Sequence, residues 1–287
     1  MKKTQKRKRF ARSLGGDIVV LVILALTGAF MAIPLLYAVV SAFKPFNEIF
    51  LFPPRFFVRR PTTENFTGLW ILATRMWVPF SRYAFNSVFV SLAATLAHIL
   101  FASAAAYPLA KHKFPGQGKI FALIVATLLF TGEVTALPQY IIMTKLGWVD
   151  TYFALIFPFI GSTFGLFLMR QFIEQMVPTQ VLEAARIDGA NEYRIFWSIV
   201  MPNVKPAWLT LAIFCFQSVW SNTGLSVVYS EQLKPLPAML QQIAASGIAR
   251  MGEGMAVSLV LILPPILIFT LFQSQIVDTM SFAGLKE

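Results

Sequence analysis

Two ionisable side chains lie inside long apolar stretches of this sequence. Glu133 follows Thr131 and Gly132 in one stretch, and His98 lies in another. Ionisable groups surrounded by hydrocarbon are costly, so each is a default candidate for function. Glu133 would accept hydrogen bonds from the hydroxyl groups of a solute, or it would be neutral and bonded to a neighbouring helix. For His98 we favour a packing role.

A polar and aromatic group occurs in another apolar stretch. It consists of Gln217, Trp220 and Asn222. An indole face packs against the C–H surface of a sugar, and amides bond its hydroxyl groups. Polar residues also hold apolar helices together, and the sequence leaves both roles open. With Glu133, these three residues form our hypothesis for a substrate pathway.

The segment from Pro178 to Pro202 has the pattern of two short helices that meet at a glycine. Pro178 suits a helix start, where an amide proton would be unpaired anyway. Gly189 suits the positive φ that ends a first helix. A second helix is expected over residues 190–200, ending before Pro202.

The first of these helices has a flat patch. Ala184 and Ala185 remove side-chain bulk, and Glu183 and Arg186 place opposite charges beside them. Such a helix can dock closely into a groove of a partner. An amphipathic helix that rests on lipid headgroups has the same spacing, so spacing alone does not separate the two.

The composition requires lipid. Of the 287 residues, 57% are hydrophobic and 13% are charged, and the mean hydropathy is +0.67. The net charge of +11 comes from lysines and arginines distributed among apolar stretches, which argues against a nucleic-acid partner. The single cysteine, Cys215, excludes an intrachain disulfide and is expected to be a packing residue.

No residues of this sequence form a motif for catalysis. It contains no Gly-x-x-x-x-Gly-Lys phosphate loop, no metal-ligand spacing and no convincing nucleophile arrangement. We therefore expect no catalytic residue, no metal site and no cofactor in this chain.

Six apolar runs are long enough to cross a bilayer. Backbone amides in lipid must pair within their own segment, so each run becomes a helix. The sequence thus predicts an all-α membrane protein with six transmembrane helices, at about residues 18–43, 85–110, 120–143, 152–172, 207–228 and 255–277.

The distribution of lysine and arginine predicts that both termini are cytoplasmic. Most basic residues fall in the predicted inside segments, above all in residues 1–12. The expected organisation is a basic N-terminus (1–17), one transmembrane domain (18–280) and a short tail (281–287). Two long segments are placed outside, at residues 44–82 and 230–254, and the second is expected to contain a short helix within 238–249.

The segment 183–202 resembles the signature loop of ABC importer permeases, in which Glu-Ala-Ala is followed by Gly and then by Ile-x-Leu-Pro. Glu183-Ala184-Ala185, Gly189 and Val200-Met201-Pro202 occupy these places. Weaker matches extend over essentially the whole chain and are closest to the smaller permease of maltose-type carbohydrate importers. They are Ser41–Phe50, Phe52-Pro53-Pro54, Pro61–Phe66, Asn86-Ser87 and Lys111–Gly116.

The resemblance implies the type I ABC importer permease fold. Its cytoplasmic coupling helix would sit in a cleft of an ATPase subunit, with Glu183 as charged anchor and Ala184 and Ala185 as flat contact. Gly189 would form the turn, and Asp188 belongs to the same coupling group. In the expected substrate pathway, this chain has Trp220-Ser221-Asn222 where relatives often have Trp-Asn-Glu, and the larger permease of that family supplies most substrate contacts.

The resemblance also implies partners and a location. They are a second permease, two ATPase subunits that bind ATP and Mg, and an extracytoplasmic solute-binding protein, all at a bacterial cytoplasmic membrane. The solute would be a sugar or oligosaccharide, and Arg55, Arg59 and Arg60 allow an acidic one. The alternatives are a non-sugar solute, or an ion-coupled transporter or membrane-embedded enzyme that uses Glu133 and His98.

Overall fold

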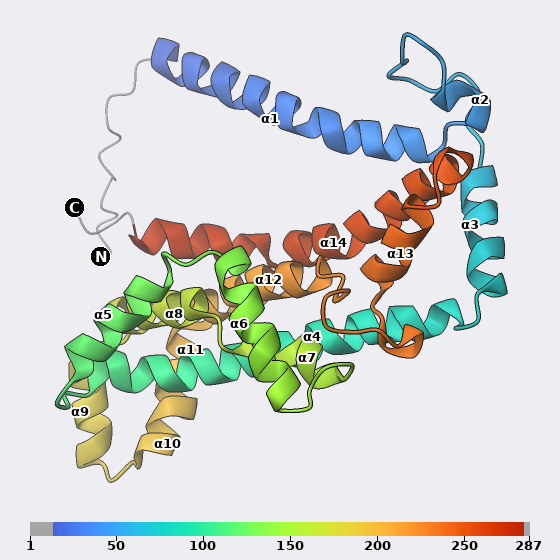
Figure 1. Ribbon diagram of the computed structural model, residues 1–287. Coiled ribbons are helices and arrows are strands. Elements are labelled where there is room, and N and C mark those ends of the chain that lie inside the picture. Colours follow the sequence, from blue (N-terminus) through green and yellow to red (C-terminus); the bar gives the residue numbers. More distant parts are fainter. Residues whose placement is uncertain (1–13, 284–287) are drawn as a thin grey trace. The chain divides into compact units, whose positions relative to one another are not determined.

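The computed structural model describes residues 14–283, and these residues form helices and connecting loops without any strand (Figure 1). Four spans are long and apolar enough to cross a membrane: Ile18–Ala42, Phe80–Lys111, Tyr152–Met176 and Ile248–Gln273. Two bent helix pairs bring the number to six if each pair is one span. The prediction of an all-α membrane protein is confirmed.

The helices of these spans have the following bounds. The four continuous spans contain α1 (Leu14–Ala42), α4 (Phe80–Lys111), α7 (Tyr152–Ile160) with α8 (Thr163–Met176), and α14 (Met251–Ala283). The first bent pair is α5 (Gln117–Thr127) with α6 (Gly132–Lys145). In the second pair, α12 (Lys205–Trp220) follows α10 (Glu192–Ile195), the π-helix η1 (Phe196–Val200) and α11 (Met201–Asn203).

The third expected helix is not continuous. The axes of α5 and α6 differ by 108° across residues 128–131. The amides of Leu128, Leu129 and Phe130 bond the carbonyls three residues earlier, which tightens the last turn of α5. Thr131 is then extended and begins α6. The prediction of a single helix over residues 120–143 is therefore wrong. It is wrong because hydropathy records the apolar character of this run but not its break.

The fifth expected helix is shorter than residues 207–228. α12 ends at Trp220, and Gly224 adopts a φ of +65°. The Asn222 side chain accepts a hydrogen bond from the Gly224 amide at 3.0 Å, which stabilises a turn there. The apolar residues 225–228 therefore belong to a loop, and their place in the helix is corrected.

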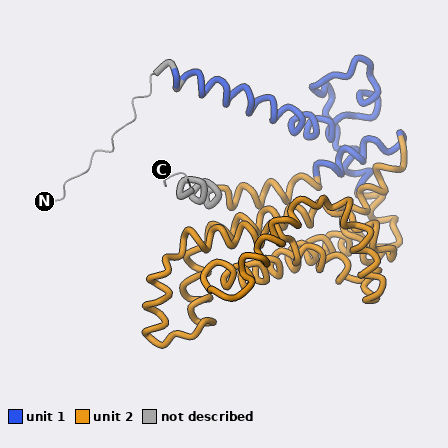
Figure 2. The backbone as a smooth tube through the Cα atoms, turned by 60° about the vertical axis from the view of Figure 1, so that its left-hand side comes forward, with its two compact units in different colours: residues 1–69, 248–259 blue, residues 70–247, 260–287 orange. Residues whose placement is uncertain are grey.

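The described chain divides into two compact units, which are shown in different colours in Figure 2. The first contains residues up to 69 and 248–259, and the second contains residues 70–247 and 260 onward. Two of the boundaries fall within α3 (Glu64–Arg75) and α14, and the third lies between residues 247 and 248.

In the first unit, Asn65 of α3 holds the end of α1. Its amide nitrogen donates to the carbonyls of Ala42 at 2.9 Å and Lys44 at 2.8 Å. After α2 (Phe46–Ile49), the carboxylate of Glu48 accepts from the amides of Arg59 and Arg60. Two of the three arginines considered for an acidic solute thus have their backbone, though not their side chains, fixed in this unit.

In the second unit, α4 is the central helix and packs against α7, α8 and α12. Gly165 of α8 makes the close approach to α4 possible, since a Cβ there would lie 2.0 Å from Nε2 of His98. The Nδ1 atom of His98 lies 3.1 Å from the carbonyl oxygen of Ile160. This buried side chain therefore packs between α4 and its neighbours α7 and α8, in agreement with the packing role favoured from the sequence.

Two apolar clusters of buried residues lie in this unit. Cys215 is buried in the smaller one, beside Val90, Leu155 and Val219, as expected of a packing residue.

In the expected outer segment, the 3-10 helix η2 (Glu231–Leu233) precedes α13 (Leu236–Ala244), and η3 (Ile248–Arg250) follows. The short helix expected within 238–249 is present, but it begins before Pro237.

Candidate functional site

The segment 178–202 folds as a helical hairpin, and its first arm is α9 (Thr179–Ile187). Gly189 has a φ of +79° as expected, and the amide of Gly189 donates to Arg186 O at 3.1 Å. The amide of Ala190 donates to Ala185 O at 2.9 Å. These two bonds form a Schellman motif, which ends the helix and satisfies its last carbonyls. The turn is therefore set by local backbone chemistry.

The second arm starts later than expected and also runs further. Asn191 caps α10, because its Oδ1 atom accepts from the amide of Arg194 at 2.8 Å. The helix continues through η1 and α11 to Asn203, and Pro202 lies inside it. The chain then bends by 78° into α12. The expected end before Pro202 is thus wrong, since proline is accommodated in the first turn of α11.

The inner side of the hairpin is buried. Leu182 is fully buried, and Ala185 and Ala190 pack against the same apolar cluster. That cluster continues through Ile195 and Val200. Both arms of the hairpin therefore share one core with α4 and α8, and the hairpin is attached firmly to the helices.

The two alanines of the expected flat patch face different ways. Ala184 is exposed together with Glu183, Asp188 and Gly189, whereas Ala185 is half-buried. Ala185 occupies the Schellman position whose side chain commonly contacts the residue after the glycine. Its small size therefore also serves the inner packing of the hairpin.

A cluster of polar side chains clamps the hairpin to the end of α4. Arg186 Nε lies 2.8 Å from Glu192 Oε1, and Tyr107 donates to Glu192 Oε2 at 2.7 Å. His112 Nε2 lies 3.3 Å from the same Oε2 atom. Arg186 thus pairs across the glycine turn and not with Glu183. Sequence reasoning missed Tyr107, His112 and Glu192, since their separation along the chain follows no helical period.

Large apolar side chains are exposed on the hairpin. Ile187 is 86% exposed and Tyr193 is 80% exposed, and Trp197 is exposed as well. Exposed apolar side chains grouped with charges are typical of a protein contact. The free side of the hairpin, which we define as Glu183, Ala184, Ile187 and Asp188, can therefore form an interface.

The four residues of the expected substrate pathway do not meet at one site. Glu133 is exposed in the first turn of α6, beside the break. Gln217 lines an apolar cavity of about 230 Å³ with Phe216 and Pro265. Asn222 lines a different cavity, with residues of α6 and α7.

The fourth residue, Trp220, is used within the chain. It is only 6% exposed, and its Nε1 atom donates to Leu261 O at 3.1 Å. Pro265 lacks an amide proton and leaves the Leu261 carbonyl without its usual helical partner. The indole replaces that partner, so Trp220 stabilises the Pro264-Pro265 region of α14.

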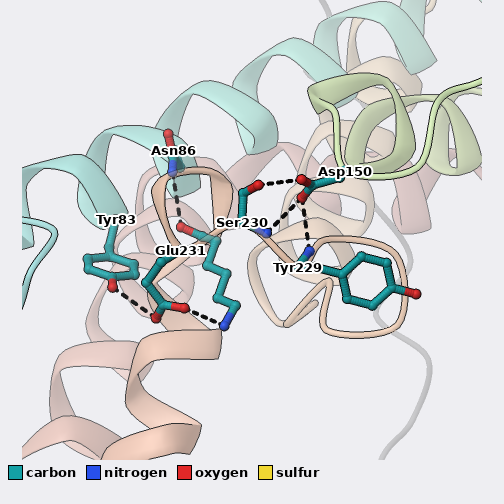
Figure 3. A network of polar contacts seen from close by, with 7 residues as sticks. Tyr83, Asn86, Asp150, Tyr229, Ser230 and Glu231 are labelled. Carbon is teal, nitrogen blue, oxygen red and sulfur yellow. Dashed lines mark hydrogen bonds and ion pairs between the residues drawn. The ribbon is translucent and has the colours of Figure 1, made fainter.

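A polar network holds the loop between α12 and α13 (Figure 3). Asp150 accepts from the amides of Tyr229 at 2.9 Å and Ser230 at 2.8 Å, and from the Ser230 hydroxyl. Hydrogen bonds from the Ser230 hydroxyl and amide, and then from the Tyr229 amide, hold the pKa of Asp150 below its ordinary value.

On the other side of this loop, Tyr83 donates to the carboxylate of Glu231, which also pairs with Lys234 (Figure 3). Asn86 donates to Gln232 O at 2.8 Å and Lys234 O at 3.0 Å. The Asn86-Ser87 pair of the sequence thus has a structural role, since Ser87 accepts from the Leu236 amide.

Comparison with known proteins decides the family. No family model matches the chain. However, the chain is 30% identical over 267 residues to the arabinooligosaccharides transport system permease protein AraQ of Halalkalibacterium halodurans, covering 90% of this chain and 92% of the relative. The chain belongs to the permease family of ABC sugar transporters.

Solved structures show that the permease has the expected fold. A bacterial ABC transporter involved in import of the acidic polysaccharide alginate contains a chain with a TM-score of 0.76 and 22% identity, covering 93% of this permease and 99% of that chain. The alginate transporter in complex with an alginate pentasaccharide-bound periplasmic protein gives a TM-score of 0.59 at 14% identity, covering 90% and 94%. The expected fold is therefore confirmed, and the permease is a multi-pass membrane protein.

Proposed function

We propose that this permease forms half of the translocation pathway of an ATP-driven, binding-protein-dependent sugar importer, with residues 18–280 as one transmembrane domain. The observation that carries this proposal is the hairpin of α9 and α10. Its inner side is buried in the transmembrane core, while its free side presents charged, small and apolar side chains. A partner that moves the hairpin would therefore move α4 and α8.

The partner on the free side is an ATPase subunit. Glu183 supplies the charged contact, and Ala184 lets the helix approach closely. Ala185, Asp188 and Gly189 complete the coupling group by shaping the turn. The chain has no phosphate loop of its own, so ATP and Mg are bound by two ATPase subunits, and rigid-body motion of the helices alternates access.

The complete importer contains a second permease and an extracytoplasmic solute-binding protein, at a bacterial cytoplasmic membrane with both termini of this chain inside. The alginate transporter solved with a periplasmic protein supports the binding protein. AraQ and the alginate transporter support a saccharide as the solute. Gln217 and Glu133 would lie along the solute's path, and the outer loops would contact the binding protein.

The coupling assignment is tested by Glu183→Arg. This chain is co-expressed with the proteins encoded by the neighbouring genes, and the complex is purified by an affinity tag on this chain. The amount of ATPase subunit that co-purifies is then measured. Charge reversal at the centre of an interface should reduce ATPase recovery about tenfold or more. Lys113→Glu is the matched control, since it reverses an exposed charge on the same predicted side outside the hairpin. Equal recovery for both variants would refute the coupling role.

The solute class is tested in proteoliposomes with a saccharide panel, which we define as arabinotriose, xylotriose, maltotriose and trigalacturonate. ATP-dependent uptake of at least one member is expected with the binding protein present. Uptake of none of them would contradict a saccharide importer. Uptake driven by a proton gradient without ATP, and lost in Glu133→Gln, would instead support the ion-coupled alternative.

A further inference from the structure

A cavity of about 650 Å³ lies between α6, α7 and the loop that follows α12. Its volume falls within the range of about 300–1,000 Å³ that is usual for small-molecule sites. Asn222, Ser226 and Tyr229 of the loop line it, and α6 contributes Gln139 and Tyr140. All these residues belong to the second unit. The cavity is separate from the hairpin and from the cavity that Gln217 lines.

The lining offers hydrogen bonds but no charge. Its polar side chains are two amides and three hydroxyls, and the lining contains no acidic or basic residue. The side-chain nitrogen of Asn222 and the side chain of Gln139 have no hydrogen-bond partner in the described chain. Amides that can both donate and accept suit hydroxyl groups, which do the same. The cavity therefore matches an uncharged, hydroxyl-rich molecule.

Aromatic rings supply the complementary apolar surface. Tyr140, Phe159 and Tyr229 line the cavity together with Pro158. A pyranose or furanose ring presents C–H groups on its faces and hydroxyl groups at its edges, so rings and amides in one cavity can recognise both. A purely apolar solute would leave the amides unpaired, which is costly.

The cavity is preorganised by the loop contacts. Tyr140 Oη lies 3.1 Å from Tyr229 Oη and joins α6 to the loop. Asp150 holds the backbone of Tyr229 and Ser230 from the other side. Its carboxylate is thereby occupied, and Asp150 does not line the cavity. Binding then requires little ordering of the loop, which favours affinity.

We infer that this cavity is a saccharide site of the permease that holds an uncharged sugar unit, with Gln139 and Asn222 bonding its hydroxyl groups and the tyrosine rings covering its face. This inference rests on the proposed function, because the expected orientation places the cavity on the outer side, where a solute enters. It also assigns a preference: neutral units bind here, and a carboxylate finds no cation.

The test uses the full importer in proteoliposomes with its binding protein and the saccharide panel. Ala136→Trp fills the cavity from α6, and Gln139→Ala removes an amide without adding bulk. Ile141→Trp is the matched control, since Ile141 is exposed on the same helix and does not line the cavity. Co-purification of all chains and the basal ATPase rate establish that each variant is assembled.

Both cavity variants should raise KM for neutral trisaccharides, by about fivefold to tenfold for Gln139→Ala, while Ile141→Trp leaves KM unchanged. A third variant, Gln139→Lys, should lower KM for trigalacturonate relative to the neutral members, since it supplies the missing cation. Wild-type KM in both cavity variants overturns the site but leaves the importer standing. If the cavity variants changed KM for trigalacturonate as much as KM for the neutral members, the preference for uncharged units would be overturned.

Discussion

Arg186 and Glu192 form an ion pair across the glycine turn, with Nε and Oε1 2.8 Å apart, and the same carboxylate accepts a hydrogen bond from Tyr107 of α4. The hairpin is therefore joined to the transmembrane helices by charge as well as by its apolar core. In the proposed importer, a force on α9 would reach α4 through Glu192. This arrangement leads to the first prediction.

Replacing Glu192 with Ala should uncouple transport from ATP hydrolysis. The free side of the hairpin is unchanged, so the ATPase should still bind, but the hairpin loses its polar clamp to α4. We expect the number of solute molecules imported per ATP to fall several-fold. The measurement is simultaneous uptake and phosphate release in proteoliposomes. Tyr107→Phe, which removes only one of the contacts to Glu192, a hydrogen bond to a charged group of about 1.5–3 kcal/mol, should have a smaller effect.

Gly189→Ala should destabilise the turn. The φ of +79° costs an alanine about 1–2 kcal/mol, and no atom lies within 4 Å of an added Cβ, so the cost is purely conformational. Amide hydrogen exchange of residues 185–195 should accelerate. Gly189→Asn should exchange more slowly than the alanine variant, because asparagine tolerates this region better.

Gly118→Ala is the control for that experiment. Gly118 lies inside α5, it also has open space around an added Cβ, and its φ is not positive. Alanine is the better helix former there, so stability should rise or stay equal. Loss of stability at Gly118 as large as at Gly189 would show that the left-handed turn is not the cause.

Gly165→Ala should separate α4 from α8. The added methyl group would lie 2.0 Å from His98 Nε2, and overpacking of this kind typically costs about 1–3 kcal/mol. The melting temperature of the purified permease should fall by several degrees. The double variant Gly165→Ala with His98→Ala should recover part of the loss, since it removes the opposing ring.

Strict additivity of the two substitutions would argue against direct contact between these residues. Retained transport in His98→Ala is also expected, because His98 contacts Ile160 and Gly165 and lines neither of the two cavities described above.

The loop contact of Asp150 should weaken in acid. The pKa of this carboxyl is lowered in the folded chain, so its contribution is present above the unfolded value and is lost as the pH falls through the folded value. Protection factors of the Tyr229 and Ser230 amides, corrected for intrinsic exchange, should therefore drop only at acidic pH.

Asp150→Asn should lower the same protection factors already at neutral pH, because an amide is a weaker acceptor than a carboxylate. Asp188→Asn is the control, since Asp188 is an exposed aspartate in the turn of the α9–α10 hairpin and does not contact this loop. If the Asp188 variant changed the Tyr229 and Ser230 amides to the same extent, the effect would not come from the Asp150 contact.

Sequence reasoning located the spans and the hairpin well but not the connections between them. Apolar runs are local properties, so α1, α4 and α14 were found within a few residues. The break between α5 and α6 was not found, since the same apolar residues continue through it. Trp220 looked like a solute contact because its partner, the carbonyl of Leu261, lies far along the chain.

The sequence by itself determined the membrane environment, the glycine turn of the hairpin and the family resemblance. Hydropathy, positive φ and short motifs act over a few neighbouring residues, so they are readable without a fold. Only the tertiary structure decided that Arg186 pairs with Glu192 and that Gln217 and Asn222 line different cavities. Those relationships depend on distances between helices, which packing sets and which no local pattern records.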